Sequence, residues 1–271
     1  MNSFVLSGQN AAAGIDAGDR GLAYGDGLFE SMRFDGARLP LWSWHSARLA
    51  NGCARLAIET PDLDSIHTGL LAVLPPGLAA KVKLIVTRGV GSGGYTITPG
   101  AAPTVLAQWQ PLSDSGGARG LRVAVLEVQL AAQPLLAGLK HLNRLEQVLA
   151  QLECARTGLD EGLLCDPSSH VICAIAANVF AVVDGVLLTP PIKDCGVAGV
   201  ARQVLLDDPM LGVQIAPLSL ATVARAQEIF LTNAVRGARP VSRCASRELA
   251  PGAGLVAARA ALAAQGLRSM A

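Results

Sequence analysis

The stretch SDSGGARG, residues 113–120, constrains most strongly what this chain can fold into. It is polar, small and rich in glycine, which is typical of a linker and unlike a helix or strand. Each half of the 271 residues mixes hairpin-like and helical patterns and is long enough to bury a core. We therefore predict two α+β domains, residues 1–112 and 121–271, joined by a linker over 113–120.

The first half contains clear strand and helix patterns. GLFESMRFDGARLPLW, from Gly27, alternates and turns at Asp35-Gly36, which predicts a β-hairpin. SWHSARLANGCARLAI has a helical period, and Ser43 precedes it as a plausible N-cap. A second helix is predicted from about Leu63 to Val73, with strands at AKVKLIVTRG and PTVLAQWQPL.

In the second half, GLKHLNRLEQVLAQLE begins at Gly138 and places several polar groups before an apolar run. Asn143 followed by Glu146 fits a capping box, so the helix should start near Arg144. A buried stripe is then predicted from Leu145, Val148, Leu149 and Leu152. Lys140 falls before the helix, where partial loss of solvation would lower its pKa and free its amine as nucleophile or base. A solvated surface lysine is the alternative.

Composition excludes several function classes. The net charge is +1, the basic residues are scattered and 4% of residues are aromatic, which argues against nucleic-acid binding. No apolar run reaches the roughly 20 residues of a spanning helix, so no membrane partner is expected. The six cysteines form no CxxC pair and no histidine lies at metal-ligand spacing, which predicts reduced thiols, no metal and a cytoplasmic protein. The N-terminus does not read as a signal peptide.

Three further segments carry candidate binding groups. CGVAGVARQ (195–203) predicts a tight turn before a helix, where backbone N–H groups of Val197 and Ala198 can face an anion. HSARL (45–49) contains Arg48, and arginine suits phosphate. DRGLAYGDGLFES (19–31) gathers Arg20 and Tyr24 among glycines, which indicates a site lining or an interface. Each alone is equally compatible with an ordinary turn or a surface arginine.

Together these segments resemble the fold-type IV pyridoxal-phosphate enzymes, and within them the 4-amino-4-deoxychorismate lyases. GLKHLNRLEQ is the most specific of the matching strings. The matching segments run in family order from residue 19 to about residue 241: DRGLAYGDGLFES, HSARL, TRGVGSGGY, AGLKHLNRLEQVLA, AANVF, TPPIKDCGVAGVARQ and LTNAV. The resemblance implies a smaller N-terminal α/β sandwich domain, a larger C-terminal domain with a β-barrel-like sheet and helices, and a homodimer.

The resemblance also implies roles for individual residues. Lys140 would form the aldimine with pyridoxal phosphate and later move protons. The other roles are distributed as follows: Arg48 would hold the phosphate, Val197 and Ala198 would offer backbone N–H groups to it, Asn233 would complete the phosphate cup, Asn178 would lie near the cofactor and substrate, and Tyr95, Arg20 and Tyr24 would contact the substrate.

The implied reaction converts 4-amino-4-deoxychorismate to 4-aminobenzoate and pyruvate, a step of folate synthesis. The free amine of Lys140 would act as base beside the substrate C4–H, and the cofactor would take up the charge. Expulsion of enolpyruvate then gives an aromatic ring, which makes the elimination strongly favourable.

One position departs from the family pattern. A glutamate that pairs with the pyridine nitrogen usually stands five residues before the AAN asparagine, and Cys173 occupies this place. A thiol cannot stabilise a pyridinium as a carboxylate does. The enzyme could tolerate a neutral pyridine, a residue distant in sequence could substitute, or ordinary cofactor chemistry could be lost. A D-amino acid or branched-chain aminotransferase on the same fold is one alternative to the lyase, and Cys173 argues against it. A non-catalytic homologue is the other alternative, and Cys173 is its support.

Overall fold

The computed structural model describes residues 2–7, 14–91, 93–112 and 120–270. These residues form two compact units. The first contains the described residues before 113 together with Lys140–Asn143, and the second contains the other described residues. Most of the linker candidate, residues 113–119, lies outside the described residues. The domain boundaries therefore stay a prediction.

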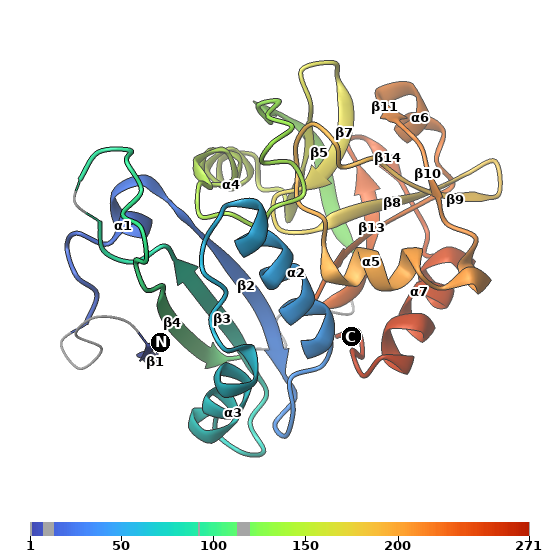
Figure 1. Ribbon diagram of the computed structural model, residues 1–271. Coiled ribbons are helices and arrows are strands. Elements are labelled where there is room, and N and C mark those ends of the chain that lie inside the picture. The colour runs from blue at the N-terminus through green and yellow to red at the C-terminus, as the bar shows by residue number, and fades with distance from the viewer. Residues whose placement is uncertain (1, 8–13, 92, 113–119, 271) are drawn as a thin grey trace. The chain divides into compact units, whose positions relative to one another are not determined.

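The first unit is built on a four-stranded antiparallel sheet in the order β1-β4-β3-β2 (Figure 1). Alternation explains its buried face: in β3, Ala80, Val82, Leu84 and Val86 are at most 1% exposed, with polar Lys81 and Lys83 among the residues between them. The elements of this unit are β1 (Asn2–Ser7), α1 (Arg20–Tyr24), β2 (Gly27–Phe34), α2 (Trp42–Arg55), α3 (Leu63–Val73), β3 (Ala80–Thr87) and β4 (Thr104–Pro111).

The predicted hairpin at Asp35-Gly36 is wrong. Strand β2 pairs with β3 over its whole length, and the segment after the turn leads into helix α2. Asp35 Oδ1 accepts hydrogen bonds from the N–H groups of Ala37 and Arg38 at 3.0 and 2.9 Å, which closes a local turn. Leu41, and not Ser43, occupies the N-cap of α2. Helix α3 has the predicted bounds.

The second unit contains a ten-stranded mixed sheet with the path β10-β9-β8-β12-β13-β5-β6-β7-β11, and β14 pairs with β13. Strand β5 runs parallel to both of its neighbours, β13 and β6. One large core includes the central strands β5 to β8, β12 and β13. The elements are β5 (Leu121–Gln129), α4 (Leu145–Thr157), β6 (Glu161–Cys165), β7 (His170–Ala174), β8 (Asn178–Val183), β9 (Val186–Thr189), α5 (Val200–Leu206), η1 (Pro209–Leu211), β10 (Gln214–Ile215), β11 (Leu218–Ser219), α6 (Leu220–Arg225), β12 (Glu228–Asn233), β13 (Gly237–Cys244), β14 (Arg247–Glu248) and α7 (Ala253–Ala264).

Helix α4 buries the face opposite to the predicted one. Ala150 and Cys154 are fully buried against β5 and β6. A Cβ added at Gly162 of β6 would lie 3.0 Å from Cys154 Sγ, so only small side chains fit this approach. The stripe predicted to be buried is exposed instead: Leu145 by 77%, Val148 by 52%, Leu149 by 54% and Leu152 by 57%.

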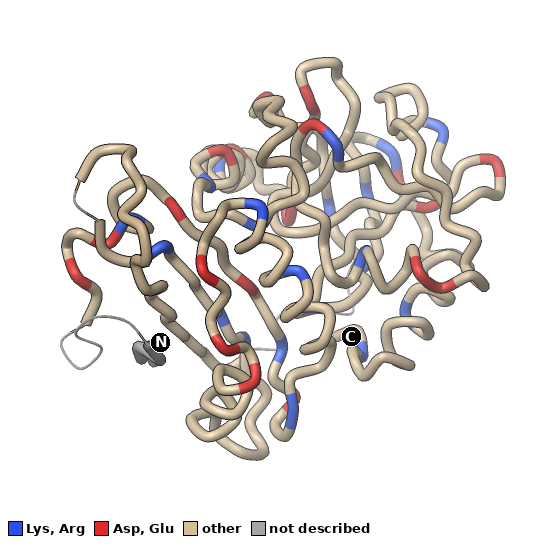
Figure 2. The backbone as a smooth tube through the Cα atoms, in the orientation of Figure 1, with Lys and Arg blue, Asp and Glu red and all other residues tan. Residues whose placement is uncertain are grey.

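Charged residues of both signs are interspersed along the described chain (Figure 2). Within the described ranges, no helix has the length and apolar character needed to cross a membrane.

Candidate active site

Lys140 lies in an extended segment that pairs with strand β2 of the first unit. Its carbonyl accepts a hydrogen bond from the Phe29 N–H at 2.9 Å, and the Leu142 N–H donates to the Gly27 carbonyl at 3.0 Å. The amine nitrogen of Lys140 lies 4.2 Å from the centre of the Phe29 ring. This pairing places Lys140–Asn143 in the first unit, whereas the sequence assigned the lysine to the C-terminal domain.

Helix α4 begins directly after Arg144, so the lysine precedes the helix as predicted. The predicted capping box is wrong, because Arg144 occupies the N-cap and makes no side-chain capping bond. Glu146 accepts a hydrogen bond from the Ala131 N–H at 2.7 Å, and Asn143 Nδ2 donates to the Gly25 carbonyl at 3.5 Å. Both side chains bind segments far away in sequence, which a local pattern cannot reveal.

A buried carboxylate and a buried imidazole meet in the core of the first unit. Glu30 follows Leu28 on the inward face of β2, and His45 precedes Leu49 on the buried stripe of α2. Both Glu30 and His45 are 1% exposed. Helix α2 packs against strand β2. Glu30 Oε2 and His45 Nδ1 therefore lie 2.6 Å apart. A charge in an alternating apolar strand and a histidine at the apolar period of a helix were visible signals, and the sequence analysis used neither.

Arg48, one turn after His45, binds the same carboxylate. Its Nε donates to Glu30 Oε1 at 2.8 Å and its Nη2 donates to Glu30 Oε2. Burial acts to raise the pKa of Glu30, but Arg48 and His45 hold it at about 2, so the carboxylate is ionised. Burial lowers the pKa of His45, the hydrogen bond and charge of Glu30 oppose this, and the charges of Arg48 and Lys140 lower it further, so that the pKa lies below its usual value. The imidazole is therefore neutral, and the tautomer with its proton on Nδ1 satisfies Glu30.

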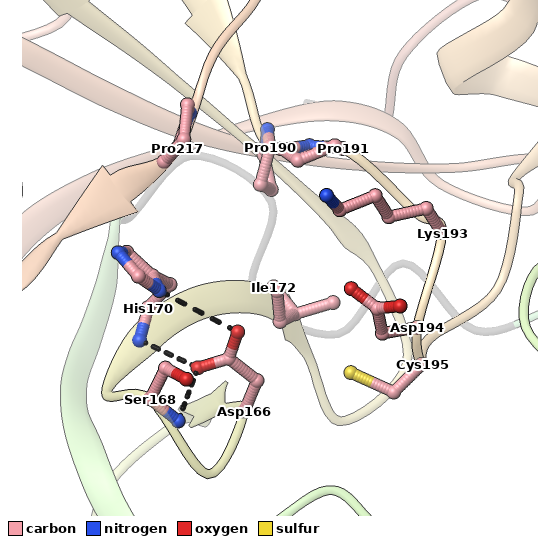
Figure 3. Close-up of a pocket in the computed structure, with 10 residues that line it drawn as sticks. All are labelled: Asp166, Ser168, His170, Ile172, Pro190, Pro191, Lys193, Asp194, Cys195 and Pro217. Carbon is pink, nitrogen blue, oxygen red and sulfur yellow. Dashed lines mark hydrogen bonds and ion pairs between the residues drawn. The ribbon is translucent and has the colours of Figure 1, made fainter. Parts of the chain in front are cut away.

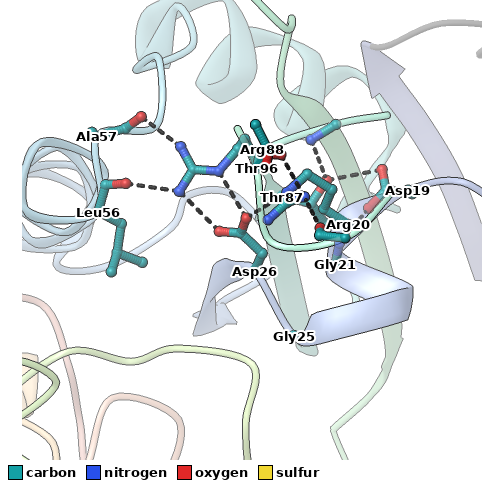
Figure 4. Close-up of polar contacts among 12 residues, drawn as sticks. Asp19, Arg20, Gly21, Gly25, Asp26, Leu56, Ala57, Thr87, Arg88 and Thr96 are labelled. Carbon is teal, nitrogen blue, oxygen red and sulfur yellow. Dashed lines mark hydrogen bonds and ion pairs between the residues drawn. The ribbon is translucent and has the colours of Figure 1, made fainter. Parts of the chain in front are cut away.

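The predicted substrate-binding residues Arg20, Tyr24 and Tyr95 lie together in the first unit. The two tyrosine rings have centres 5.4 Å apart, and the Arg20 guanidinium lies 5.0 Å from the Tyr24 ring. Arg20 Nε also bonds to Asp26 at 2.8 Å, and its Nη1 donates to the Thr96 carbonyl at 3.2 Å (Figure 4). Arg20 thus holds the loop that presents Tyr95, which is 87% exposed. Direct contact between Arg20 and the substrate stays a prediction. The bonds of the Arg20 guanidinium to Asp26 and Thr96 do not favour this role.

In the second unit, the turn before α5 is held from two sides. The Gly138 N–H donates to the Gly196 carbonyl at 3.0 Å, and the Ala198 N–H donates to the Gly138 carbonyl at 3.1 Å. Asn178 Nδ2 donates to the Val197 carbonyl at 2.9 Å. The Ala198 N–H is thus used within the chain, which argues against its predicted role as a phosphate donor. Asn178 is 6% exposed and fixes the turn.

Asn233 closes a second turn in this unit. Its Oδ1 accepts hydrogen bonds from the N–H groups of Val235 and Arg236 at 3.0 and 2.8 Å, and its Nδ2 donates to the Ala176 carbonyl at 3.2 Å. Because Ala176 and Asn178 are two residues apart, one short segment holds both turns. The structure therefore gathers four predicted residues around that segment: Asn178, Val197, Ala198 and Asn233.

Cys173 is a buried, neutral thiol. Burial raises its pKa to about 12, nearby Cys195 acts in the same direction, and Arg144 opposes them. The carboxylates of Glu161 and Glu146 also raise this pKa, so two acids distant in sequence lie in its electrostatic surroundings. One Glu161 oxygen is buried without a hydrogen-bond partner in the described structure, and burial raises the pKa of this carboxyl. Sequence reasoning connected neither acid with Cys173.

A cavity of about 240 Å³ lies elsewhere in the second unit (Figure 3). The loop after β9 contributes Lys193, Asp194 and Cys195, and the β6–β7 hairpin contributes Asp166 and His170. None of the predicted site residues lines this cavity. The described residues contain no group of three or more His, Cys, Asp or Glu side chains that could hold a metal ion.

Comparison with known proteins assigns the family. Residues 27–244 match the family described as amino-transferase class IV. The chain belongs to the class IV aminotransferases. The fold-class prediction is confirmed, since the structure of a 4-amino-4-deoxychorismate lyase from Pseudomonas aeruginosa superimposes with a TM-score of 0.86 and 39% identity. That similarity covers 96% of this chain and 98% of the other.

Two relatives of this chain carry different names. An aminodeoxychorismate lyase from Vibrio harveyi is 32% identical over 247 residues, which is 86% of this chain and 89% of the relative. A putative branched-chain-amino-acid aminotransferase from Methanocaldococcus jannaschii is also 32% identical, over 84% of this chain and 82% of the relative. Sequence identity to these two proteins alone does not separate a lyase from an aminotransferase.

Membership of this family confirms the prediction of pyridoxal phosphate as cofactor. The groups of the first unit fit it. Pyridoxal phosphate requires a primary amine for its aldehyde and a cation for its phosphate. Lys140 would supply the amine and Arg48 the guanidinium, and the charges of both act on His45.

Proposed function

We propose that this chain is a pyridoxal-phosphate-dependent lyase that converts 4-amino-4-deoxychorismate to 4-aminobenzoate and pyruvate. One observation carries the proposal: the charges of Lys140 and Arg48, 92 positions apart in the numbering, both act on His45, which bonds to the ionised Glu30 in the same unit. The Lys140 amine and the Arg48 guanidinium occur here in a chain that is 39% identical to a 4-amino-4-deoxychorismate lyase.

Each residue has a distinct task in this proposal. Arg48 would hold the cofactor phosphate through its guanidinium. Lys140 would hold the cofactor aldehyde, and its amine, once released by the substrate, would remove the proton from C4 of the substrate. When bound, the cofactor supplies an electron sink for the charge left at that carbon. The C–O bond would then break with its electron pair going to the oxygen of enolpyruvate, which takes up a proton to become pyruvate, and the ring would become aromatic.

Residues of the second unit have supporting tasks. Asn178 and Asn233 hold the turns before α5 and after β12 in place, and the resemblance to fold-type IV enzymes assigns both residues to cofactor binding. Val197 offers its backbone at the first of these turns, whereas the predicted N–H of Ala198 already has a partner within the chain. In the first unit, Tyr95, which is 87% exposed, provides a ring surface for the substrate.

Cys173 favours the lyase over an aminotransferase. An aminotransferase must protonate the cofactor's own carbon, and a carboxylate on the ring nitrogen stabilises the charge held until then. The buried thiol of Cys173, with its pKa of about 12, supplies no negative charge. Elimination in the lyase is driven by aromatisation and depends less on that charge. The aminotransferase stays the second candidate because of the 32% identity to a putative aminotransferase.

We also propose a homodimer, with the exposed apolar face of α4 in its interface. Leu145, Val148, Leu149 and Leu152 follow the i, i+3, i+4, i+7 spacing of one helix face, and all are more than half exposed. A contiguous apolar face of this kind marks a protein contact. A second copy fits best, because a twofold axis brings the same face of two chains together. A cytoplasmic location remains proposed from the absence of CxxC pairs among the six cysteines.

The test supplies the purified protein with pyridoxal phosphate and 4-amino-4-deoxychorismate and measures 4-aminobenzoate and pyruvate together. We expect both products in equal amounts, and none from Lys140→Ala. Lys83→Ala is the matched control, because the Lys83 amine lies 5.0 Å from the same Phe29 ring and should not be required. Unconsumed substrate with a fully loaded cofactor would reject the lyase. Conversion of the cofactor to its pyridoxamine form by D-alanine would favour the aminotransferase.

A further inference from the structure

We propose that Glu30 and His45 are positioning residues that orient the guanidinium of Arg48, and that the preference for a phosphorylated cofactor depends on them. This inference rests on the proposed function, in which Arg48 binds the phosphate. Neither residue needs to touch the cofactor. They act through the fixed direction of one side chain.

The contacts around Glu30 form a closed clamp. Glu30 Oε1 accepts from Arg48 Nε at 2.8 Å, and Glu30 Oε2 accepts from both Arg48 Nη2 and His45 Nδ1. Two parallel N–H···O bonds fix the plane and the rotation of a guanidinium, which a single bond cannot do. The fork geometry of arginine then directs its other N–H groups away from Glu30.

Burial makes this clamp rigid. The side chains of Glu30 and His45 are 2% and 1% exposed, while that of Arg48 is 17% exposed. An ionised carboxylate in such a place is strongly unfavourable unless it is paired, so Glu30 retains Arg48. His45 occupies the position on Glu30 Oε2 that a water molecule or a second rotamer would otherwise use. The two bonds to Glu30 thus fix the direction in which the exposed end of the Arg48 side chain points.

An alternative role for Glu30 is purely electrostatic, and it predicts the opposite sign. A negative charge beside Arg48 weakens the attraction of an anion. If charge alone mattered, removing it with Glu30→Gln would strengthen phosphate binding, and Glu30→Asp would change nothing. If Glu30 positions Arg48, both substitutions weaken phosphate binding, because aspartate keeps the charge but withdraws the oxygens by one methylene group.

The experiment compares pyridoxamine 5′-phosphate with pyridoxamine, because neither forms a bond with Lys140. The ratio of their two dissociation constants, measured by calorimetry on the full chain, isolates the contribution of the phosphate. We expect Glu30→Asp, Glu30→Gln and His45→Leu each to reduce this preference by about tenfold to a hundredfold. His45→Asn should restore most of it, because its amide can donate to Glu30 from nearly the same place as Nδ1.

Two controls separate positioning from general damage. Asp26→Asn removes a partly buried carboxylate that bridges Arg20 and Arg88 in the same unit and should lower stability without changing the preference. An unchanged preference in Glu30→Asp with a stronger one in Glu30→Gln, or an equal loss in Asp26→Asn, overturns the inference. Arg48→Leu should abolish the preference. If the preference survives in Arg48→Leu, the assignment of Arg48 to the phosphate fails as well. If Arg48→Leu is the only variant that reduces the preference, that assignment stands and only the roles of Glu30 and His45 are rejected.

Discussion

Replacing Cys173 with glutamate tests how deeply this position is buried and what it faces. Burial is the largest reason that the thiol pKa rises from 9.0 to about 12. This rise corresponds to roughly 4 kcal/mol against a charged group, since one pKa unit is about 1.4 kcal/mol. A glutamate carboxylate at this position meets a penalty of similar order, which Arg144 partly offsets. The new carboxyl should therefore keep its proton to a higher pH in the folded protein than in the unfolded chain.

The direction of the pH effect follows from proton binding. Below a pH of roughly 4, the carboxyl is protonated in both states and the penalty is absent. At higher pH the unfolded chain releases the proton while the folded protein keeps it. The free energy of unfolding then falls by about 1.4 kcal/mol for each pH unit. The loss should reach at most roughly 4 kcal/mol at and above neutral pH.

Urea denaturation of Cys173→Glu and Cys173→Gln without cofactor, at several values between about pH 4.5 and about pH 8, measures this loss. The glutamine variant is neutral and of nearly the same size, so the difference between the two isolates the charge. A difference that stays constant with pH would refute the reasoning about burial. Pyridoxal phosphate should stabilise the glutamate variant more than the glutamine variant at neutral pH if residue 173 faces the ring nitrogen. Equal stabilisation of both would show that it does not.

Two further predictions concern assembly and stability. Burying the exposed half of Leu149 contributes about 1 kcal/mol and counts twice in a symmetric dimer, so Leu149→Glu should weaken dimerisation at least tenfold in analytical ultracentrifugation. Val256→Glu, at a 67% exposed site on α7, is the control; equal masses for both variants would reject the α4 interface. Glu228 is 4% exposed and accepts the N–H groups of Gly252, Gly254 and Leu255 at 2.8 to 3.0 Å, so Glu228→Ala should lower the free energy of unfolding by roughly 3 kcal/mol or more. Glu248→Ala, at an exposed residue, should change the free energy of unfolding by less than about 0.5 kcal/mol. A loss below about 1 kcal/mol for Glu228→Ala would contradict a stabilising role of its three hydrogen bonds to the start of α7.

The sequence predicted the helices α2, α3 and α4 and the strands β3 and β4, because the apolar period of a helix or strand is a local property. Helix α3 has the predicted bounds, and Lys140 precedes α4 as expected. The family was also readable, since its segments are short strings in a fixed order. The hairpin at Asp35-Gly36 failed because a turn residue defines a local bend but not the strand that follows it.

Tertiary structure decided what depends on partners far apart in sequence. Helix α4 carries apolar residues on two faces, and only its packing against β5 and β6 shows that the face with Ala150 and Cys154 is the buried one. Asn143 and Glu146 fit a capping pattern, yet distant backbone groups take their side chains. The clamp of Glu30, His45 and Arg48 needs a strand and a helix to pack face to face. Periodicity indicates which residues share a face of one element, but only packing determines which faces meet, and the electrostatics of a site follow from that meeting.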